Sequence, residues 1–231
     1  MFQFKQFTIR QDRCAMKVGT DGAVLGAWAK VEGAKRILDI GTGTGLLALM
    51  AAQRNADARI DAVEIDEAAA EQAQENVHSS PWVDRIRVHW MDARRLSASE
   101  PFDRVICNPP YYPGEMSATA ASASIAKHSA ELKLDELVAT VNRLLADDGR
   151  FAVIVPANRE RDLCQATEDV GLLVVRRGPL HYLEGRPFKR VLLEFERRYC
   201  EVEHDPVTVE HAPGTYTEQY KTLLEPFMLH F

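Results

Sequence analysis

No stretch of this 231-residue sequence has the ~18 consecutive apolar residues that a membrane-spanning helix needs. The first thirteen residues are interrupted by charge at Lys5, Arg10, Asp12 and Arg13, so they lack the apolar core of a secretory signal. Both absences argue against an integral membrane protein and against a secreted one. We therefore expect a soluble, cytoplasmic protein that does not bind membranes.

Cysteine is scarce as well. The four cysteines, Cys14, Cys107, Cys164 and Cys200, show no Cys-x-x-Cys spacing. A chain of this length does not need disulfides to hold a core, so we expect free thiols and no metal site. Cys107 lies in an apolar strand pattern, where a cysteine usually serves as a small buried side chain.

The sequence also lacks an excess of positive charge. Its 34 Asp and Glu residues outnumber 28 Lys and Arg residues, which gives a formal net charge of −6. A uniformly basic nucleic-acid binder is thereby excluded, although a local basic face can exist on an acidic protein. The length predicts one domain over 1–231, with a covering N-terminal extension at 1–35, a core at 36–199 and a tail at 200–231 that packs on the core.

From Arg36 onward, short β-rich runs alternate with longer helical patterns, which is typical of βαβ units and a mostly parallel sheet. Two further β-like runs follow without a helix between them and are expected to pair antiparallel, with Gly178-Pro179 and Gly185-Arg186-Pro187 as breaks. The predicted fold is α/β, a doubly wound seven-stranded sheet with a C-terminal antiparallel hairpin. The predicted strands are 36–40, 59–63, 86–90, 102–107, 151–155, 172–177 and 190–195, and the helices 46–54, 67–78, 134–145 and 159–170.

Three alternating glycines follow the first predicted strand and open a helix. Such glycines let the backbone turn tightly and approach a ligand at the helix N-terminus. A dinucleotide fingerprint of the G-x-G-x-x-G type would need its third glycine at Leu46, so the spacing favours adenosylmethionine over NAD. The predicted cofactor loop contains Asp39, Gly41, Gly43 and Gly45.

Acidic residues end the next two strands. Glu64 is placed to accept the ribose hydroxyls of a cofactor at the carboxyl edge of the sheet, with Ile65 beside it. Asp66 is instead suited to cap the following helix. Asp92, followed by Ala93, can accept from the amino group of a cofactor adenine or can cap a turn, and the sequence leaves both open.

The segment Asn108-Pro109-Pro110-Tyr111 follows the fourth predicted strand. An Asn side-chain oxygen and the carbonyl oxygen of the next proline can each accept one N–H of a planar amine, which frees the nitrogen lone pair for methyl transfer. The prolines stiffen the turn, and Tyr111 offers a ring on which a base can stack. These four residues are the predicted catalytic group, and no general base is assigned.

These motifs together resemble the class I amino-methyltransferases of the N-P-P-Y type, and they are most similar to the bacterial tRNA(Val) adenine-37 N6-methyltransferases. The N-P-P-Y motif alone also occurs in release-factor glutamine methyltransferases and DNA adenine methyltransferases. The resemblance implies a Rossmann-like fold, S-adenosylmethionine as cofactor and tRNA as partner. It implies a pocket-closing role for Thr20 and Asp21 and a substrate-side position for Tyr112, Lys127 and His128. The closer match is carried by the segments Lys17-Val18-Gly19-Thr20-Asp21-Gly22 with Trp28, Asn108-Pro109-Pro110-Tyr111-Tyr112, and Tyr216-Thr217-Glu218-Gln219-Tyr220.

A local basic segment occurs in the predicted hairpin. Residues 176–198 hold seven Arg or Lys against three Glu, and Arg186, Lys189 and Arg190 are the predicted RNA contacts. A solvated hairpin face of mixed charge is the alternative. For the whole chain, the alternatives to methylation of an adenine in tRNA are methylation of a protein glutamine, as in the release-factor enzymes, and a non-catalytic RNA-binding or chaperone module. We expect a monomer.

Overall fold

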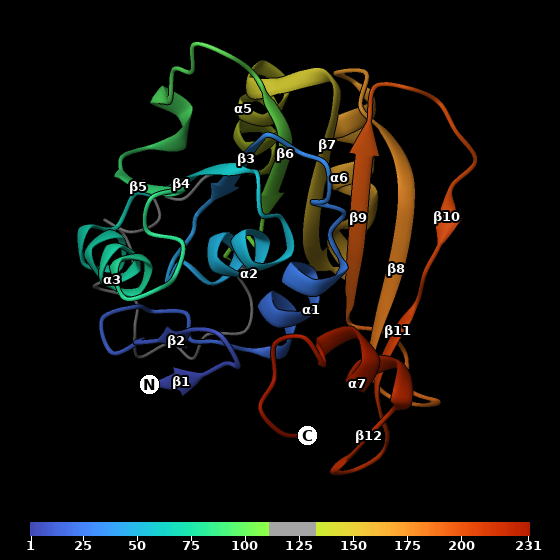
Figure 1. The fold of residues 1–231 in the computed structure, drawn as a ribbon. Coiled ribbons are helices and arrows are strands. Elements are labelled where there is room, and N and C mark those ends of the chain that lie inside the picture. Colours follow the sequence, from blue (N-terminus) through green and yellow to red (C-terminus); the bar gives the residue numbers. More distant parts are fainter. Residues whose placement is uncertain (111–132) are drawn as a thin grey trace, which may run out of the picture.

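The computed structural model describes residues 1–110 and 133–231. Seven strands form the core of one sheet, as predicted (Figure 1). Five of them run parallel to one another, and one strand of the C-terminal hairpin runs antiparallel to its two neighbours. The predicted mostly parallel sheet with an antiparallel hairpin is therefore confirmed. In spatial order the strands are β5 (Ile86–Trp90), β4 (Arg59–Glu64), β3 (Arg36–Ile40), β6 (Phe102–Cys107), β7 (Leu145–Pro156), β9 (Arg190–Glu196) and β8 (Leu173–Leu183).

Helices cover both faces of this sheet (Figure 1), so the central strands are apolar on both sides. In β3, Ile37 packs with helices α1 and α2, whereas its neighbour Leu38 packs on the opposite face with α5 and α6. In the described residues no helix is long and apolar enough to cross a membrane. The helices are α1 (Thr20–Trp28), α2 (Leu46–Arg54), α3 (Glu67–His78), α5 (Leu134–Leu144), α6 (Glu160–Glu168) and α7 (Glu218–Leu224).

The C-terminal tail extends the sheet, which the sequence analysis did not predict. Strand β11 (Val207–Ala212) runs parallel to β8, and β12 (Thr215–Tyr216) pairs with β11. Strand β10 (Glu203–His204) also pairs with β8. At the other terminus, β1 (Phe2–Gln3) and β2 (Thr8–Ile9) form a separate two-stranded sheet.

One predicted break lies inside a strand. Gly178 and Pro179 pair with β9 within β8, so this segment does not turn. A Cβ on Gly178 would come within 2.7 Å of the Asp205 carbonyl oxygen and 3.2 Å of the Trp28 ring. These two groups approach the backbone so closely that only a glycine fits here. Strand β7 begins at Leu145, before the predicted strand 151–155, and its register against β6 shifts near residues 147–149.

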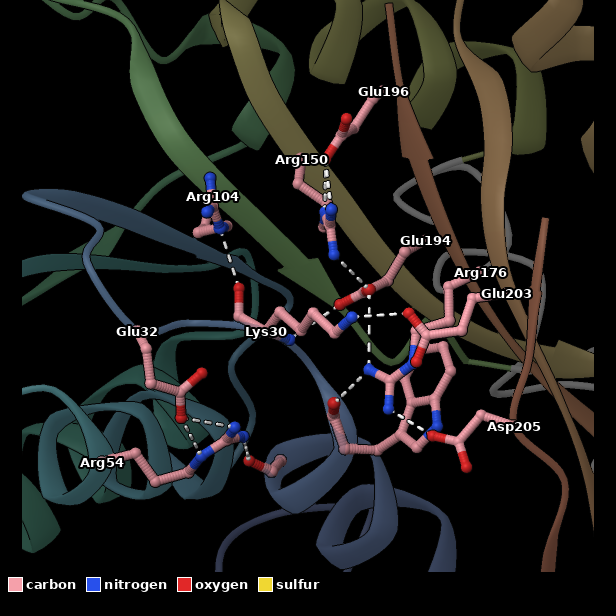
Figure 2. Close-up of polar contacts among 12 residues, drawn as sticks. Lys30, Glu32, Arg54, Arg104, Arg150, Arg176, Glu194, Glu196, Glu203 and Asp205 are labelled. Carbon is pink, nitrogen blue, oxygen red and sulfur yellow. Dashed lines mark hydrogen bonds and ion pairs between the residues drawn. The ribbon is translucent and has the colours of Figure 1, made fainter. Parts of the chain in front are cut away.

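A buried carboxylate joins α1 to the hairpin strands (Figure 2). Glu194 in β9 is fully buried, and its carboxylate accepts from the Arg150 guanidinium at 2.9 Å and from the Lys30 backbone N–H at 2.7 Å. Arg176 lies 3.6 Å from the same carboxylate and donates to the Trp28 carbonyl oxygen at the end of α1. Its guanidinium also stacks 3.9 Å from the Trp28 ring centroid. This network fixes the N-terminal extension on β7, β8 and β9.

Replacing Glu194 by Gln should destabilise the protein by about 3 kcal/mol, because it removes the counter-charge that the buried Arg176 and the partly buried Arg150 share. Urea unfolding followed by circular dichroism measures the change. Glu218→Gln is the matched control, since Glu218 pairs with Lys221 on the exposed surface of α7 and should leave the unfolding midpoint almost unchanged. Equal effects of the two substitutions would contradict the assigned importance of the buried network.

Candidate active site at the carboxyl edge of the sheet

A cleft of about 710 Å³ lies where β3, β4, β5 and β6 end. Loops that follow these parallel strands line it, together with residues 14–17 and 19–22 of the N-terminal extension and Tyr182 of β8. The carboxyl edge of an open α/β sheet is the usual place for a ligand. Of the predicted site residues, the cleft is lined by Thr20, Asp21, Gly41, Gly43, Glu64, Ile65, Asp92, Ala93, Asn108, Pro109 and Pro110.

The glycine loop has the conformation that its spacing predicts. Gly41, Gly43 and Gly45 have φ angles of 70°, 55° and 84°, a region that other residues rarely adopt. A Cβ on Gly41 or Gly43 would meet nothing within 4 Å, so backbone conformation requires these two glycines. Gly45 is the N-cap of α2 and does not line the cleft itself. The loop forms a cradle of backbone ahead of a helix N-terminus.

Glu64 holds this loop to the end of the neighbouring strand. One carboxylate oxygen accepts the Gly43 N–H at 2.9 Å, and the other accepts the N–H groups of Ile65 and Asp66 at 2.9 and 3.0 Å. Asp66 accepts from Ala69 and caps α3, as the sequence predicted. Glu64 therefore shapes the cleft in addition to its predicted contact with a ribose.

Asp39 lies under the loop, fully buried, and does not line the cleft. Burial raises the pKa of its carboxyl group to about 7, while hydrogen bonds from the Thr42 hydroxyl and the Ala48 N–H act in the opposite direction. The same oxygen accepts both bonds. Among the described residues the other oxygen has no hydrogen-bond partner. Asp39 thus supports the loop from below.

Asp92 makes the cap that the sequence left open, and its contact with a cofactor adenine stays a prediction. It lines the cleft, and it also caps the short helix η1 (Ala93–Arg95) by accepting the Arg94 N–H at 2.9 Å. The Arg94 guanidinium donates to both of its oxygens and holds the pKa of this carboxyl below its usual range. The capping interaction fixes the carboxylate at the edge of the cleft.

Asn108 directly follows β6, is half-buried and lines the cleft. Its amide nitrogen lies 3.7 Å from the Met16 sulfur. A Cβ on Gly22 would lie 3.6 Å from the same nitrogen, so the N-terminal extension approaches Asn108 closely. The predicted substrate residues Tyr111, Tyr112, Lys127 and His128 lie outside the described residues.

The geometry agrees with the comparisons with known proteins. The family model "Methyltransferase small domain" matches residues 17–163. A tRNA1(Val) (adenine(37)-N6)-methyltransferase of Phocaeicola vulgatus is 44% identical over 99% of this chain and 97% of its own length. The protein of the same name from Trichodesmium erythraeum is 40% identical over 100% and 98%. The chain belongs to this methyltransferase family.

A solved structure agrees on the fold. A predicted O-methyltransferase from Agrobacterium tumefaciens superposes with a TM-score of 0.68 at 20% identity, over 90% of this chain and 96% of that one. This likeness shows the Rossmann-like fold, while the family membership shows a methyltransferase, whose cofactor is S-adenosylmethionine. The open glycine cradle, the carboxylate of Glu64 and the size of the cleft fit such a group.

Two buried amides of α3 hold the N-terminal extension of this methyltransferase over the cleft. Asn76 donates to the carbonyl oxygens of Arg10 and Thr44 and accepts the Arg10 N–H, so it joins the extension to the glycine loop. Gln72 accepts the Arg13 N–H at 3.0 Å. Since buried polar groups require partners, these bonds specify where residues 10–13 cross α3.

The predicted pocket-closing residue Asp21 is engaged within the protein. Its two carboxylate oxygens accept from the Tyr182 hydroxyl and, at 3.0 Å, from the Arg190 guanidinium. Arg190 was predicted to contact RNA. In the structure it is the ion-pair partner of Asp21, and its contact with RNA stays a prediction.

The basic hairpin is less positive than its local sequence indicates. Arg176 is buried and pairs with Glu194, Glu203 and Asp205, and Arg177 pairs with Glu160 at 2.8 Å. These partners lie mostly outside the segment 176–198, so a local charge count misses them. In the part of the chain that the structure describes, no carboxylate pairs with Arg186 or Lys189, and both are exposed.

Among the cleft residues that sequence reasoning missed are Tyr182, Met16 and Met91. Met16 directly precedes the Lys17–Gly22 block, and Met91 directly precedes Asp92, so their positions beside recognised motifs were available signals. Tyr182 carried no signal, because it lies in a hairpin with no recognisable motif.

The raised pKa of Asp39 has a definite consequence for stability. Between about pH 4, the ordinary pKa of an aspartate, and pH 7, the folded protein retains a proton that the unfolded chain has lost. The contribution of Asp39 to the free energy of unfolding should therefore fall as the pH rises through this window.

Urea unfolding of the wild type and of Asp39→Asn at pH 5, 6, 7 and 8, without cofactor, measures this contribution. The free energy of unfolding of the wild type minus that of the variant should decrease with rising pH, because the Asn side chain does not titrate. A difference that is constant or increases would contradict the raised pKa.

Proposed function

We propose that this methyltransferase transfers a methyl group from S-adenosylmethionine to the exocyclic N6 amino group of an adenine in tRNA, specifically adenine 37 of a tRNA(Val). The observation that carries the proposal is Asn108-Pro109-Pro110 at the end of β6, in the same cleft as the glycine cradle and Glu64. The names of the two relatives agree with this substrate. The expected monomeric state and cytoplasmic location remain predictions.

The cofactor residues divide into binding and support. Glu64 and Asp92, at the ends of β4 and β5, are proposed to accept from the ribose hydroxyls and the adenine amino group. The glycine loop and Ile65 line the same part of the cleft, and Asp39 supports the loop from beneath. When bound there, S-adenosylmethionine supplies an electrophilic methyl group.

The acceptor chemistry falls to Asn108 and Pro109. The nitrogen lone pair of an adenine amino group is delocalised into the ring, which makes the nitrogen a poor nucleophile. The Asn108 side-chain oxygen and the Pro109 carbonyl oxygen can each accept one N–H, which draws the nitrogen toward tetrahedral geometry and localises its lone pair for attack on the methyl group. No general base is needed, because the methylated nitrogen becomes acidic and its proton can leave to water.

The proposed RNA surface lies beside the part of the cleft that contains Asn108. Arg186 and Lys189 lie in the turn between β8 and β9, which projects from the carboxyl edge, and Lys17 lines the cleft itself. Their side chains are exposed. Clustered cations of this kind attract a polyanion even when the protein as a whole is acidic.

The alternatives receive less support. A release-factor glutamine methyltransferase acts on a protein, whereas the two relatives are named for an adenine in tRNA. A non-catalytic RNA-binding module does not require Asn108 beside an intact cofactor cradle. Reaction with unmodified tRNA, followed by mass spectrometry of the nucleosides, should yield N6-methyladenosine. Methylation found only on protein would overturn the proposal.

Asn108→Ala should lower kcat by about 10²–10³-fold and leave cofactor affinity nearly unchanged, because it removes an oriented acceptor and none of the proposed cofactor contacts. Glu64→Gln, which preserves the size of the side chain, should show the reverse, with the main loss in cofactor affinity. Isothermal titration with S-adenosylhomocysteine and single-turnover kinetics separate the two effects. Loss of affinity in step with activity in Asn108→Ala would contradict this division of roles.

The double substitution Arg186→Ala/Lys189→Ala should weaken tRNA binding and reduce the slope of log affinity against log salt by up to about 1 for each lost phosphate contact. Filter binding at several salt concentrations measures both quantities. The control is Lys35→Ala/Arg59→Ala, which removes two exposed cations at the opposite, amino edge of β3 and β4. Identical salt slopes for the two double variants would place the RNA surface elsewhere.

A further inference from the structure

Tyr182 reaches the cleft from a strand that the cofactor motifs do not include. Strand β8 is antiparallel to β9, which is antiparallel to β7, so β8 runs in the direction of the parallel strands. Tyr182 lies one residue before the end of β8 and therefore stands at the same carboxyl edge as the glycine loop. Arg190 begins β9 on the other side of the turn and lies at this edge as well.

The polar end of Tyr182 is already engaged. Its hydroxyl donates to Asp21 of α1, and the guanidinium of Arg190 donates to the second oxygen of that carboxylate. The Asp21 and Arg190 side chains are only 22% and 24% exposed, so water screens this pair less than it screens surface pairs. Burial and the neighbouring carboxylate raise the pKa of Tyr182, which therefore stays neutral. Since the hydroxyl is used, the part of Tyr182 available to a ligand is its ring.

The ring belongs to the acceptor end of the cleft. The proposed cofactor carboxylates Glu64 and Asp92 follow β4 and β5, on one side of β3. Asn108 follows β6 on the other side of β3, and Tyr182 lies farther in that direction, beyond β7 and β9. Gly22, the neighbour of Asp21 in α1, approaches the Asn108 amide closely. The three linked residues thus stand beside Asn108 and away from the cofactor carboxylates.

We propose that the ring of Tyr182 forms a wall of the acceptor end and contacts the target base, while Asp21 and Arg190 act as positioning residues that hold this ring. This inference rests on the proposed function, since it assigns a specificity-determining contact within the same site. Each member comes from a different element, α1, β8 or β9, so the wall forms only when the N-terminal extension and the hairpin are docked together. An aromatic wall suits a flat base and contributes through stacking or edge contact.

The test compares Tyr182→Leu, which removes the ring, with Tyr182→Phe, which keeps the ring and removes the bond to Asp21. Tyr182→Leu should lower kcat/KM for tRNA by about 10- to 100-fold, the range for loss of one base contact, with unchanged affinity for S-adenosylhomocysteine. Tyr182→Phe should retain most tRNA affinity and lose a few-fold in kcat, because the ring remains but is held less firmly. Tyr199→Ala is the control, since Tyr199 is 87% exposed after the opposite end of β9 and should behave as the wild type.

A second readout separates contact from stability. In a tRNA with 2-aminopurine in place of the target adenine, fluorescence should be quenched by the wild type and by Tyr182→Phe, and it should be higher with Tyr182→Leu. Arg190→Ala should shift the melting temperature as much as Tyr182→Phe does. Arg190→Lys should recover part of the kcat that Arg190→Ala loses.

Equal fluorescence with Leu and Phe, or a loss of S-adenosylhomocysteine affinity in Tyr182→Leu, would overturn the inference. If the wild type methylates no tRNA at all, the proposed function fails instead, and the variant comparison is not reached.

Discussion

Five parallel strands end at one edge of the sheet, and the position of every cofactor and acceptor residue depends on that geometry. Between two parallel strands the chain must cross back to the edge of the sheet at which the first strand began. The segments that follow the parallel strands therefore all lie at the carboxyl edge. The glycine loop, Glu64, Asp92 and Asn108 lie at the ends of β3, β4, β5 and β6, respectively, and meet in one cleft although 69 positions separate Asn108 from Asp39 in the chain. The hairpin obeys the same rule, since β8 runs with the parallel strands and brings Tyr182 to this edge.

The segments outside the alternating core are held by buried polar groups. Glu194 fixes the end of α1 to β7 and β8, and Asn76 fixes residues near Arg10 to the glycine loop. A buried polar atom costs free energy unless it is paired, so each of these groups admits few alternative placements of its partner segment. The extension therefore lines the cleft in a defined position, where Met16 and Gly22 approach Asn108.

Charge in this protein has to be read in three dimensions. The hairpin is locally basic, but three of its arginines pair with acids from other segments. Arg176 pairs with the tail, Arg177 with α6 and Arg190 with α1. These arginines organise the fold, and only cations such as Arg186 and Lys189 are exposed for a phosphate. A positive segment on an acidic chain is thus divided between structural and binding roles, and local composition does not reveal the division.

The sequence by itself determined the features whose physical cause is local. Alternating glycines demand positive φ angles, Asp66 caps the helix that follows it, and Asn108 with two prolines forms a stiff turn at a strand end; each of these depends on neighbours within a few residues. The seven core strands followed from periodicity in the same way. Tertiary structure alone decided that Tyr182 lines the cleft and that Arg190 binds Asp21, because the bonds from these residues to Asp21 span 161 and 169 positions. It also decided that the tail adds strands to β8 and that Gly178 serves close approach, since both depend on segments that meet only after the sheet has formed.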